Sequence, residues 1–90
     1  MFIDDMFEDL LINKKMQYKD ACAEVCNEKL KSKKDWNFTN IRRIENGYQG
    51  CVRKYPALNP RAFRYYVYIK APQLCKDLGW SAEFEKEAGR

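Results

Sequence analysis

"WNFTNIRRIENGYQG", residues 36–50, places two adjacent arginines between a helix-start signal and a glycine stop. Asn37 or Thr39 suits a helix N-cap, and Asn46–Gly47 suits an end in the left-handed conformation. Two isoleucines three positions apart would share one face of this helix. The stretch therefore predicts a very short basic helix. Because isolated helices shorter than about 12–15 residues are marginal in water, neighbouring elements must hold it.

Two further helices are predicted before this stretch. Large apolar residues recur at helical spacing over residues 2–11, with two aspartates near the positive N-terminal end. That periodicity ends near residues 13–15. A second apolar stripe, rich in small residues, predicts a helix over residues 18–29. Residues 30–37 then form a basic loop in which Trp36 is the only large apolar anchor.

The segment after Gly50 fits two templates. Asn59–Pro60 is a helix-start signal, whereas the alternation of apolar and polar residues from Phe63 to Lys70 suits a strand. We favour the helix, because its start signal is the more specific. Either element ends at Ala71–Pro72. The expected fold is mainly α, a small helix-turn-helix bundle, with a short β-hairpin or wing around residues 52–70 as the alternative.

Two short C-terminal helices complete the expected domain. The first follows Pro72 and stops at Gly79, and the second is acidic, begins after Ser81 and covers residues 82–90. We find no repeat, low-complexity tract or linker. Residues 1–90 are therefore expected to form a single domain, with a helix-turn-helix core at about 2–50 and an aromatic, helical extension at 51–90.

Charge is divided unevenly along the chain. Residues 1–30 carry four lysines against seven acidic residues, a net charge of −3. Residues 31–70 carry ten lysines and arginines against Asp35 and Glu45, a net charge of +8. Such a basic segment is typical of a nucleic-acid-binding surface, although a run of charge can also be an ordinary solvated face.

The four cysteines, at positions 22, 26, 51 and 75, are expected to be reduced and buried. The chain has no histidine and no CxxC pair, so no metal ion is expected. It also has no glycine-rich phosphate loop and no paired acid and base, so we expect neither a cofactor nor enzymatic activity. No segment resembles a signal peptide or membrane span, which favours a cytoplasmic protein without membrane contact.

Residues 16–50 resemble the DNA-binding region of large serine recombinases. In that pattern a "sYxxIAxxLN" helix is followed by a polar loop, a tryptophan, a second helix and often "NxxYxG". The matching residues here are Tyr18, Ala21, Val25, Cys26, Asn27, Trp36, Ile41, Ile44, Asn46, Tyr48 and Gly50. The end "IRRIENG" also resembles Cro-like phage regulators. The link between the helices is about ten residues too long for a Cro-like protein, Cys26 replaces the usual leucine, and no recombinase catalytic domain is present.

This resemblance implies a regulator that binds double-stranded DNA by placing its second helix in the major groove. The residues expected to contact bases are Thr39, Asn40, Arg42 and Arg43. The residues expected to contact phosphates are Gln17, Lys31, Lys33, Lys34, Arg53 and Lys54. The alternative for the two arginines is a solvated helix face, with Glu45 as a partner.

The aromatic residues leave other functions open. Specific recognition by one short helix would call for a homodimer, and the expected interface residues are Tyr65, Tyr66 and Tyr68. The tyrosines could instead stack on single-stranded nucleic acid or fill the core. The competing function is a small phage-type inhibitor or adaptor that binds a host nucleic-acid-binding protein complex, such as a defence system.

Overall fold

The computed structural model describes residues 2–88, with side chains described as far as residue 85. The chain forms α1 (Ile3–Glu8), which continues into a π-helical turn (Asp9–Asn13), α2 (Tyr18–Lys29), a 3-10 turn (Lys33–Asp35), α3 (Phe38–Lys54), α4 (Ala62–Lys70), α5 (Pro72–Asp77) and α6 (Ala82–Ala88). The predicted mainly-α fold class is confirmed, and residues 2–88 contain no strand.

The β-hairpin or wing considered for residues 52–70 is therefore wrong. Its first arm stays helical because α3 continues to Lys54. Its second arm is α4, which begins after a turn in which the Asn59 side chain accepts a hydrogen bond from the backbone nitrogen of Arg61 at 2.9 Å. The favoured helical reading of Phe63–Lys70 is confirmed, and so are the bounds expected for α2.

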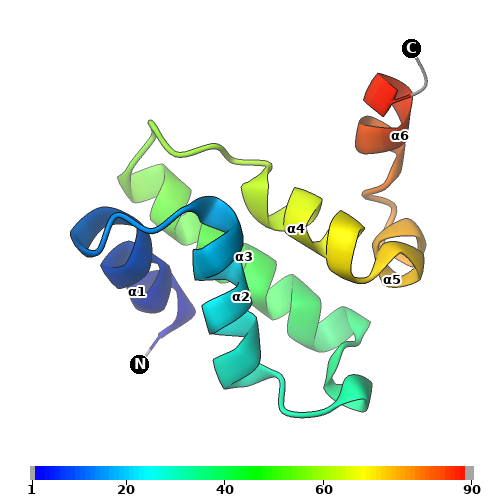
Figure 1. The fold of residues 1–90 in the computed structure, drawn as a ribbon, viewed down its shortest axis with the longest axis horizontal. Helices are drawn as coiled ribbons and strands as arrows, with labels where there is room; N and C mark the ends of the chain where they lie inside the picture. Colours follow the sequence, from blue (N-terminus) through cyan, green and yellow to red (C-terminus); the bar gives the residue numbers. More distant parts are fainter. Residues whose placement is uncertain (1, 89–90) are drawn as a thin grey trace.

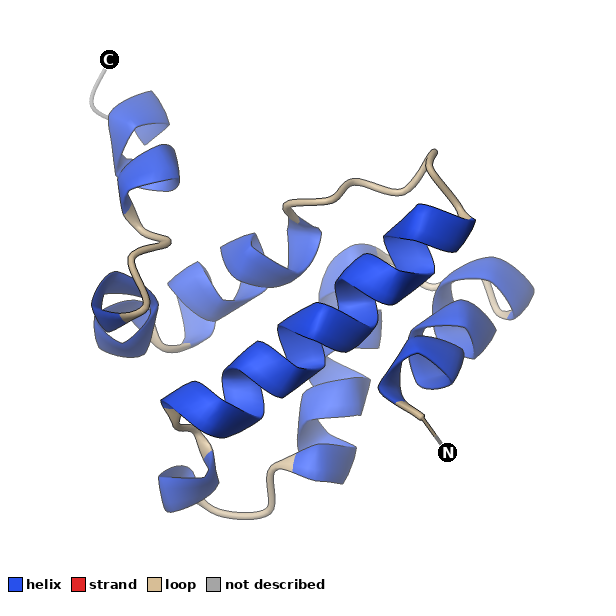
Figure 2. Ribbon diagram, turned by 180° about the vertical axis from the view of Figure 1, so that it is seen from behind, coloured by secondary structure: helices blue, strands red, loops and turns tan. Residues whose placement is uncertain are grey.

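The helices are arranged in a thin molecule whose principal extents are 35 × 31 × 18 Å. In the view of Figure 1, α2 and α4 lie toward the front, and α3 passes behind them. Figure 2 shows the opposite side, where α3 crosses the front of the molecule. The helix α1 packs against the C-terminal half of α3, and α5 and α6 follow from the end of α4.

The predicted end of the basic helix at Asn46–Gly47 is wrong, because α3 runs on through both glycines for 17 residues. Gly47 does not end the helix but allows α1 to pack closely against α3. A Cβ atom placed on Gly47 would lie 2.4 Å from Cγ2 and 2.7 Å from Cβ of Ile3, and 3.3 Å from the backbone nitrogen of Asp4. The first turn of α1 therefore rests directly on the α3 backbone.

Three aromatic rings from three helices form the centre of the core. Phe7 of α1 meets Tyr48 of α3 edge-on at 5.0 Å between ring centroids and Phe63 of α4 at 6.2 Å. All three residues are fully buried. The Tyr48 hydroxyl donates a hydrogen bond to the backbone oxygen of Asn59, so the loop before α4 is fastened to α3.

The four cysteines are buried and unpaired, as expected. Burial raises the pKa of the Cys22 and Cys26 thiols to about 12, which keeps both thiols protonated at neutral pH.

The predicted helix end at Gly79 is also confirmed. Gly79 has a φ of 82°, and the Trp80 backbone nitrogen donates a hydrogen bond to the Cys75 backbone oxygen across the end of α5. The predicted C-terminal helix begins at Ala82, but residues 89–90 lie outside the described residues.

Substitution of the two α3 glycines should have opposite effects. Gly47→Ala should lower the free energy of unfolding, because overpacking costs about 1–3 kcal/mol and here the α1 backbone must move. Gly50→Ala should raise it by up to about 1 kcal/mol, because its new Cβ would meet Asp4 no closer than 3.5 Å and alanine favours helix. Urea unfolding of both variants measures the difference. Equal effects would contradict the close contact at Gly47.

Candidate nucleic-acid interface

The basic loop is fixed to the first turn of α3. Ser32 and Asp35 form a reciprocal capping box around the 3-10 turn. Asn37 caps α3 by accepting a hydrogen bond from the Asn40 backbone nitrogen at 3.0 Å, and its amide donates to the Lys34 oxygen at 3.0 Å. The lysines of the turn are therefore held beside the positive end of α3.

The cations at this end of the molecule are exposed. Neither Lys33 nor Lys34 in the turn, nor Arg42 or Arg43 on α3, forms an ion pair with another described residue. Exposed Thr39 lies on the same turns of α3, and Lys31 precedes the 3-10 turn. We name this set the basic surface: Lys31, Lys33, Lys34, Thr39, Arg42 and Arg43.

Asn40 has a different position from the other predicted base-contacting residues. It is partly buried, and its side-chain amide donates a hydrogen bond to the backbone oxygen of Asp35 at 2.9 Å. This bond joins the 3-10 turn to α3. The amide nitrogen is therefore committed within the protein, unlike the side chains of Arg42 and Arg43.

The solvated-face alternative made Glu45 the partner of Arg42 and Arg43, but Glu45 forms an ion pair with neither arginine. Only 4% of Glu45 is exposed, and its carboxylate accepts a hydrogen bond from Nε of Arg64 on α4. Gln49 donates a second hydrogen bond to the same carboxylate at 3.2 Å. Because Glu45 is the only acidic residue of α3, the helix presents no carboxylate on its exposed face.

The C-terminal end of α3 is electrostatically different. Lys54, a predicted phosphate contact, forms an ion pair with Glu8 of α1 at 2.9 Å. Arg53 is exposed, but its guanidinium approaches Gly50, where the Asp4 carboxylate also lies. The acidic side chains of α1 thus adjoin this end of α3 and set it apart from the basic surface.

The structure separates the remaining predicted contacts. Gln17 precedes the first residue of α2, whereas the basic loop follows the last, so the length of α2, about 18 Å, lies between them. Among the predicted interface tyrosines, Tyr65 is exposed and Tyr66 is buried in the core. Tyr68 is partly buried against Phe84 of α6, at 5.3 Å between ring centroids.

Sequence reasoning missed Phe38, the first residue of α3, which is 45% exposed beside the basic surface. Phe38 is three positions before the buried Ile41, a spacing that predicts a core position. Nothing in the sequence therefore indicated that Phe38 is exposed. Phe38 and Trp80 form walls of a pocket of about 220 Å³ next to Arg42. The Arg64 guanidinium lies over the Trp80 ring, 5.0 Å from its centroid, on the inner side of this pocket.

The described part of the chain has neither a metal-binding cluster of acidic and cysteine side chains nor a membrane-spanning helix. No group of three or more cysteine, aspartate or glutamate side chains there is placed to hold a metal ion. None of its helices is long and apolar enough to span a bilayer.

The contact of Glu8 with α3 predicts a pH-dependent stability. Hydrogen bonds from the Tyr55 hydroxyl and the Lys54 ammonium group lower the pKa of Glu8 below 4.5. A lowered pKa in the folded state stabilises the fold above the unfolded-state pKa, and this contribution disappears as pH falls through the folded-state value.

As the pH falls from about 6.5 to about 3, the free energy of unfolding of Glu8→Gln should therefore decrease less than that of the wild type. Urea midpoints at the two pH values measure this difference. Glu28→Gln is the matched control, because Glu28 is exposed and has no ion pair with a described residue. If Glu8→Gln and Glu28→Gln change the pH dependence equally, the Glu8 contact is not formed.

Comparisons of this chain with protein-family models, with curated proteins and with solved structures find no match. Any functional conclusion therefore depends on the residues and contacts described above.

Proposed function

We propose that this protein binds double-stranded DNA through the basic surface and acts as a small sequence-specific regulator by occupying a promoter or operator. The observation that carries this proposal is the group of exposed cations on the turn and first half of α3, without ion-pair partners among the described residues. Neutralising phosphates releases counterions, which makes such a surface favourable for nucleic acid.

The shape of the molecule is compatible with a helix entering the major groove. On the side shown in Figure 2, α3 crosses the front of the protein, and no other helix lies over it. A helix with its side chains is about 10–12 Å wide, and the major groove is about 12 Å wide. The exposed Arg42 and Arg43 would reach base edges, while the lysines of the loop would contact the flanking phosphates.

The proposed footprint is smaller than the one expected from the sequence. Arg42, Arg43 and Thr39 remain the proposed base contacts, and Lys31, Lys33 and Lys34 the proposed phosphate contacts. Lys54 is engaged by Glu8, and Asp4 and Glu8 would repel phosphates near the end of α3. The protein would therefore contact DNA with the N-terminal half of α3 only.

A homodimer joined through the predicted interface tyrosines does not suit this mode of DNA binding. Tyr65 belongs to α4, on the side of the molecule opposite the exposed face of α3. Two copies joined through Tyr65 would direct their α3 helices away from each other, so both could not contact one straight duplex. We therefore propose that one monomer is the DNA-binding unit. Sedimentation equilibrium with and without duplex should give a monomer and a one-to-one complex.

Arg42→Ala/Arg43→Ala should weaken duplex binding at least about tenfold and abolish any sequence motif, because a bidentate arginine contact contributes about 1–3 kcal/mol of discrimination. Fluorescence anisotropy with random duplex, and site selection from a randomised library, measure the two effects. Lys33→Ala should instead weaken binding to all sequences alike and reduce the salt slope by about 1.

The matched control is Lys14→Ala/Lys76→Ala, which removes the same charge from exposed positions outside the basic surface. If this control weakens binding as much as the arginine variant, the effect is one of net charge alone. Binding that the arginine variant retains in full would contradict the proposal and favour the alternative function, an inhibitor or adaptor acting on a host protein complex.

A further inference from the structure

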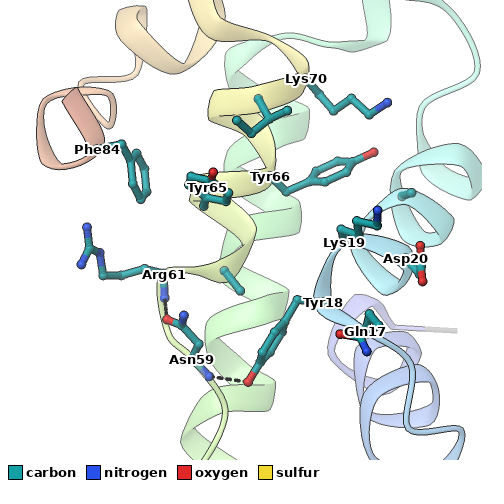
Figure 3. Close-up of a pocket in the computed structure, with 13 residues that line it drawn as sticks. Gln17, Tyr18, Lys19, Asp20, Asn59, Arg61, Tyr65, Tyr66, Lys70 and Phe84 are labelled. Carbon is teal, nitrogen blue, oxygen red and sulfur yellow. Dashed lines mark hydrogen bonds between the residues drawn. The ribbon is translucent and has the colours of Figure 1, made fainter. Parts of the chain in front are cut away.

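A groove of about 1090 Å³ lies between α2 and α4, on the side of the molecule opposite the exposed face of α3. Figure 3 shows Tyr66 extending from α4 toward α2, where Lys19 lies on the facing wall. One end of the groove is fixed by a hydrogen bond from the Asn59 backbone nitrogen to the Tyr18 hydroxyl at 2.8 Å. Both helical walls are thus held in place.

The groove exposes two large apolar side chains to a substantial extent, although one edge of the Tyr65 ring meets the Phe84 ring at 5.4 Å between centroids. Tyr65 is 52% exposed and Ile69 is 57% exposed, and these residues are four positions apart on α4. They form a ridge along one edge of the groove, whereas small side chains, Ala23 and Ala62, also line it. An exposed apolar ridge at the edge of an open groove is a surface against which the side chains of another helix can pack.

The charge of the groove selects the chemistry of its occupant. Two lysines, Lys19 and Lys70, line the groove against Asp20 alone, while the lining cation Arg61 pairs with Glu83. Lys19 and Lys70 are exposed, one on each helical wall. Apolar contacts flanked by lysines favour a partner helix whose apolar face is bordered by aspartate or glutamate.

Single-stranded nucleic acid fits this groove less well. Bases stack on successive exposed aromatic rings. Here Tyr66 and Phe84 are only 8% and 6% exposed, so their rings are covered. Of the two large apolar side chains that the groove exposes, Ile69 offers no ring for stacking.

We propose that the groove between α2 and α4 is a docking site for an acidic amphipathic helix of a partner protein. The helix would place apolar side chains against Tyr65 and Ile69 and acidic side chains beside Lys19 and Lys70. Because the groove and the basic surface lie on opposite sides, the partner and a DNA duplex could bind at the same time. The docking site does not depend on the proposed DNA binding.

The test is selection from a displayed library of helical peptides of about 16 residues, with fixed apolar positions at helical spacing and randomised polar positions. Peptides enriched on the wild-type protein should carry aspartate or glutamate at the polar positions. Ile69→Ser and Lys70→Glu should each weaken their binding at least about tenfold in isothermal titration calorimetry, as expected for residues at the centre of an interface.

Two matched controls locate the binding. Phe2→Ser removes an exposed apolar side chain outside the groove, since Phe2 is 79% exposed, and should leave peptide affinity unchanged. Arg42→Ala/Arg43→Ala should also leave it unchanged, whatever its effect on DNA. Circular dichroism checks the fold of each variant, and Lys70→Glu keeps the test valid if Ile69→Ser destabilises the protein.

Several results would overturn the docking site. These are no enriched peptide, enrichment without acidic residues, or affinity that both groove variants retain. An oligothymidine of about 12 nucleotides that binds the wild type but not Ile69→Ser would identify the groove as a nucleic-acid site instead. Self-association that Ile69→Ser abolishes would show that a second copy occupies it.

Discussion

The missing side chain at Gly47 is the constraint on which the fold depends. It lets the backbone of α1 rest on the middle of α3, and this contact brings Phe7 against Tyr48. Tyr48 in turn meets Phe63 and fastens the loop before α4, so α1, α4 and that loop all contact one residue of α3. With a larger side chain at position 47, α1 would move outward and the aromatic centre would lose one of its three rings.

The sequence allowed good predictions where a residue has one structural use, and poor predictions where it has two. The apolar stripe of α2 was interpreted correctly, because periodicity acts locally. The segment after Pro60 is helical as favoured, but α4 begins at Ala62 with Arg61 as its N-cap, two residues later than the Asn59–Pro60 signal predicts. Gly47 was wrongly predicted to end the helix. A glycine that ends a helix and a glycine that allows two helices to cross closely look identical in the sequence. The partnership of Glu45 with Arg64 spans 19 positions, and no local pattern indicates it. The exposure of Arg42 and Arg43 agrees with expectation, but their role stays a prediction.

Folding redistributes the positive charge of the central segment. Along the sequence, residues 31–70 form one basic block with a net charge of +8. In space, Arg64 turns inward to Glu45, Lys54 pairs with Glu8, and Arg61 pairs with Glu83 of α6 at 3.4 Å. Five cations of this block that form no ion pair with a described residue lie in the first half of α3 and the loop before it: Lys31, Lys33, Lys34, Arg42 and Arg43. Lys19 and Lys70 lie by the groove on the other side. A molecule this thin can therefore present two separate basic regions on opposite sides.

The ion pair of Arg64 with Glu45 has a consequence for how α4 is turned about its own axis. In the segment "AFRYYVYIK", apolar and aromatic residues lie on both faces of the helix, because Phe63 and Val67 are fully buried whereas Tyr65 and Ile69 are exposed. A rotation that brought Tyr65 inward would turn the fully buried Phe63 and Val67 away from the core and separate Arg64 from Glu45. The only charged side chain in the middle of α4 is Arg64, and the buried carboxylate of Glu45 accepts it in one rotation only. Together with the burial of Phe63 and Val67, this polar contact sets which tyrosine of α4 faces inward and which stays exposed.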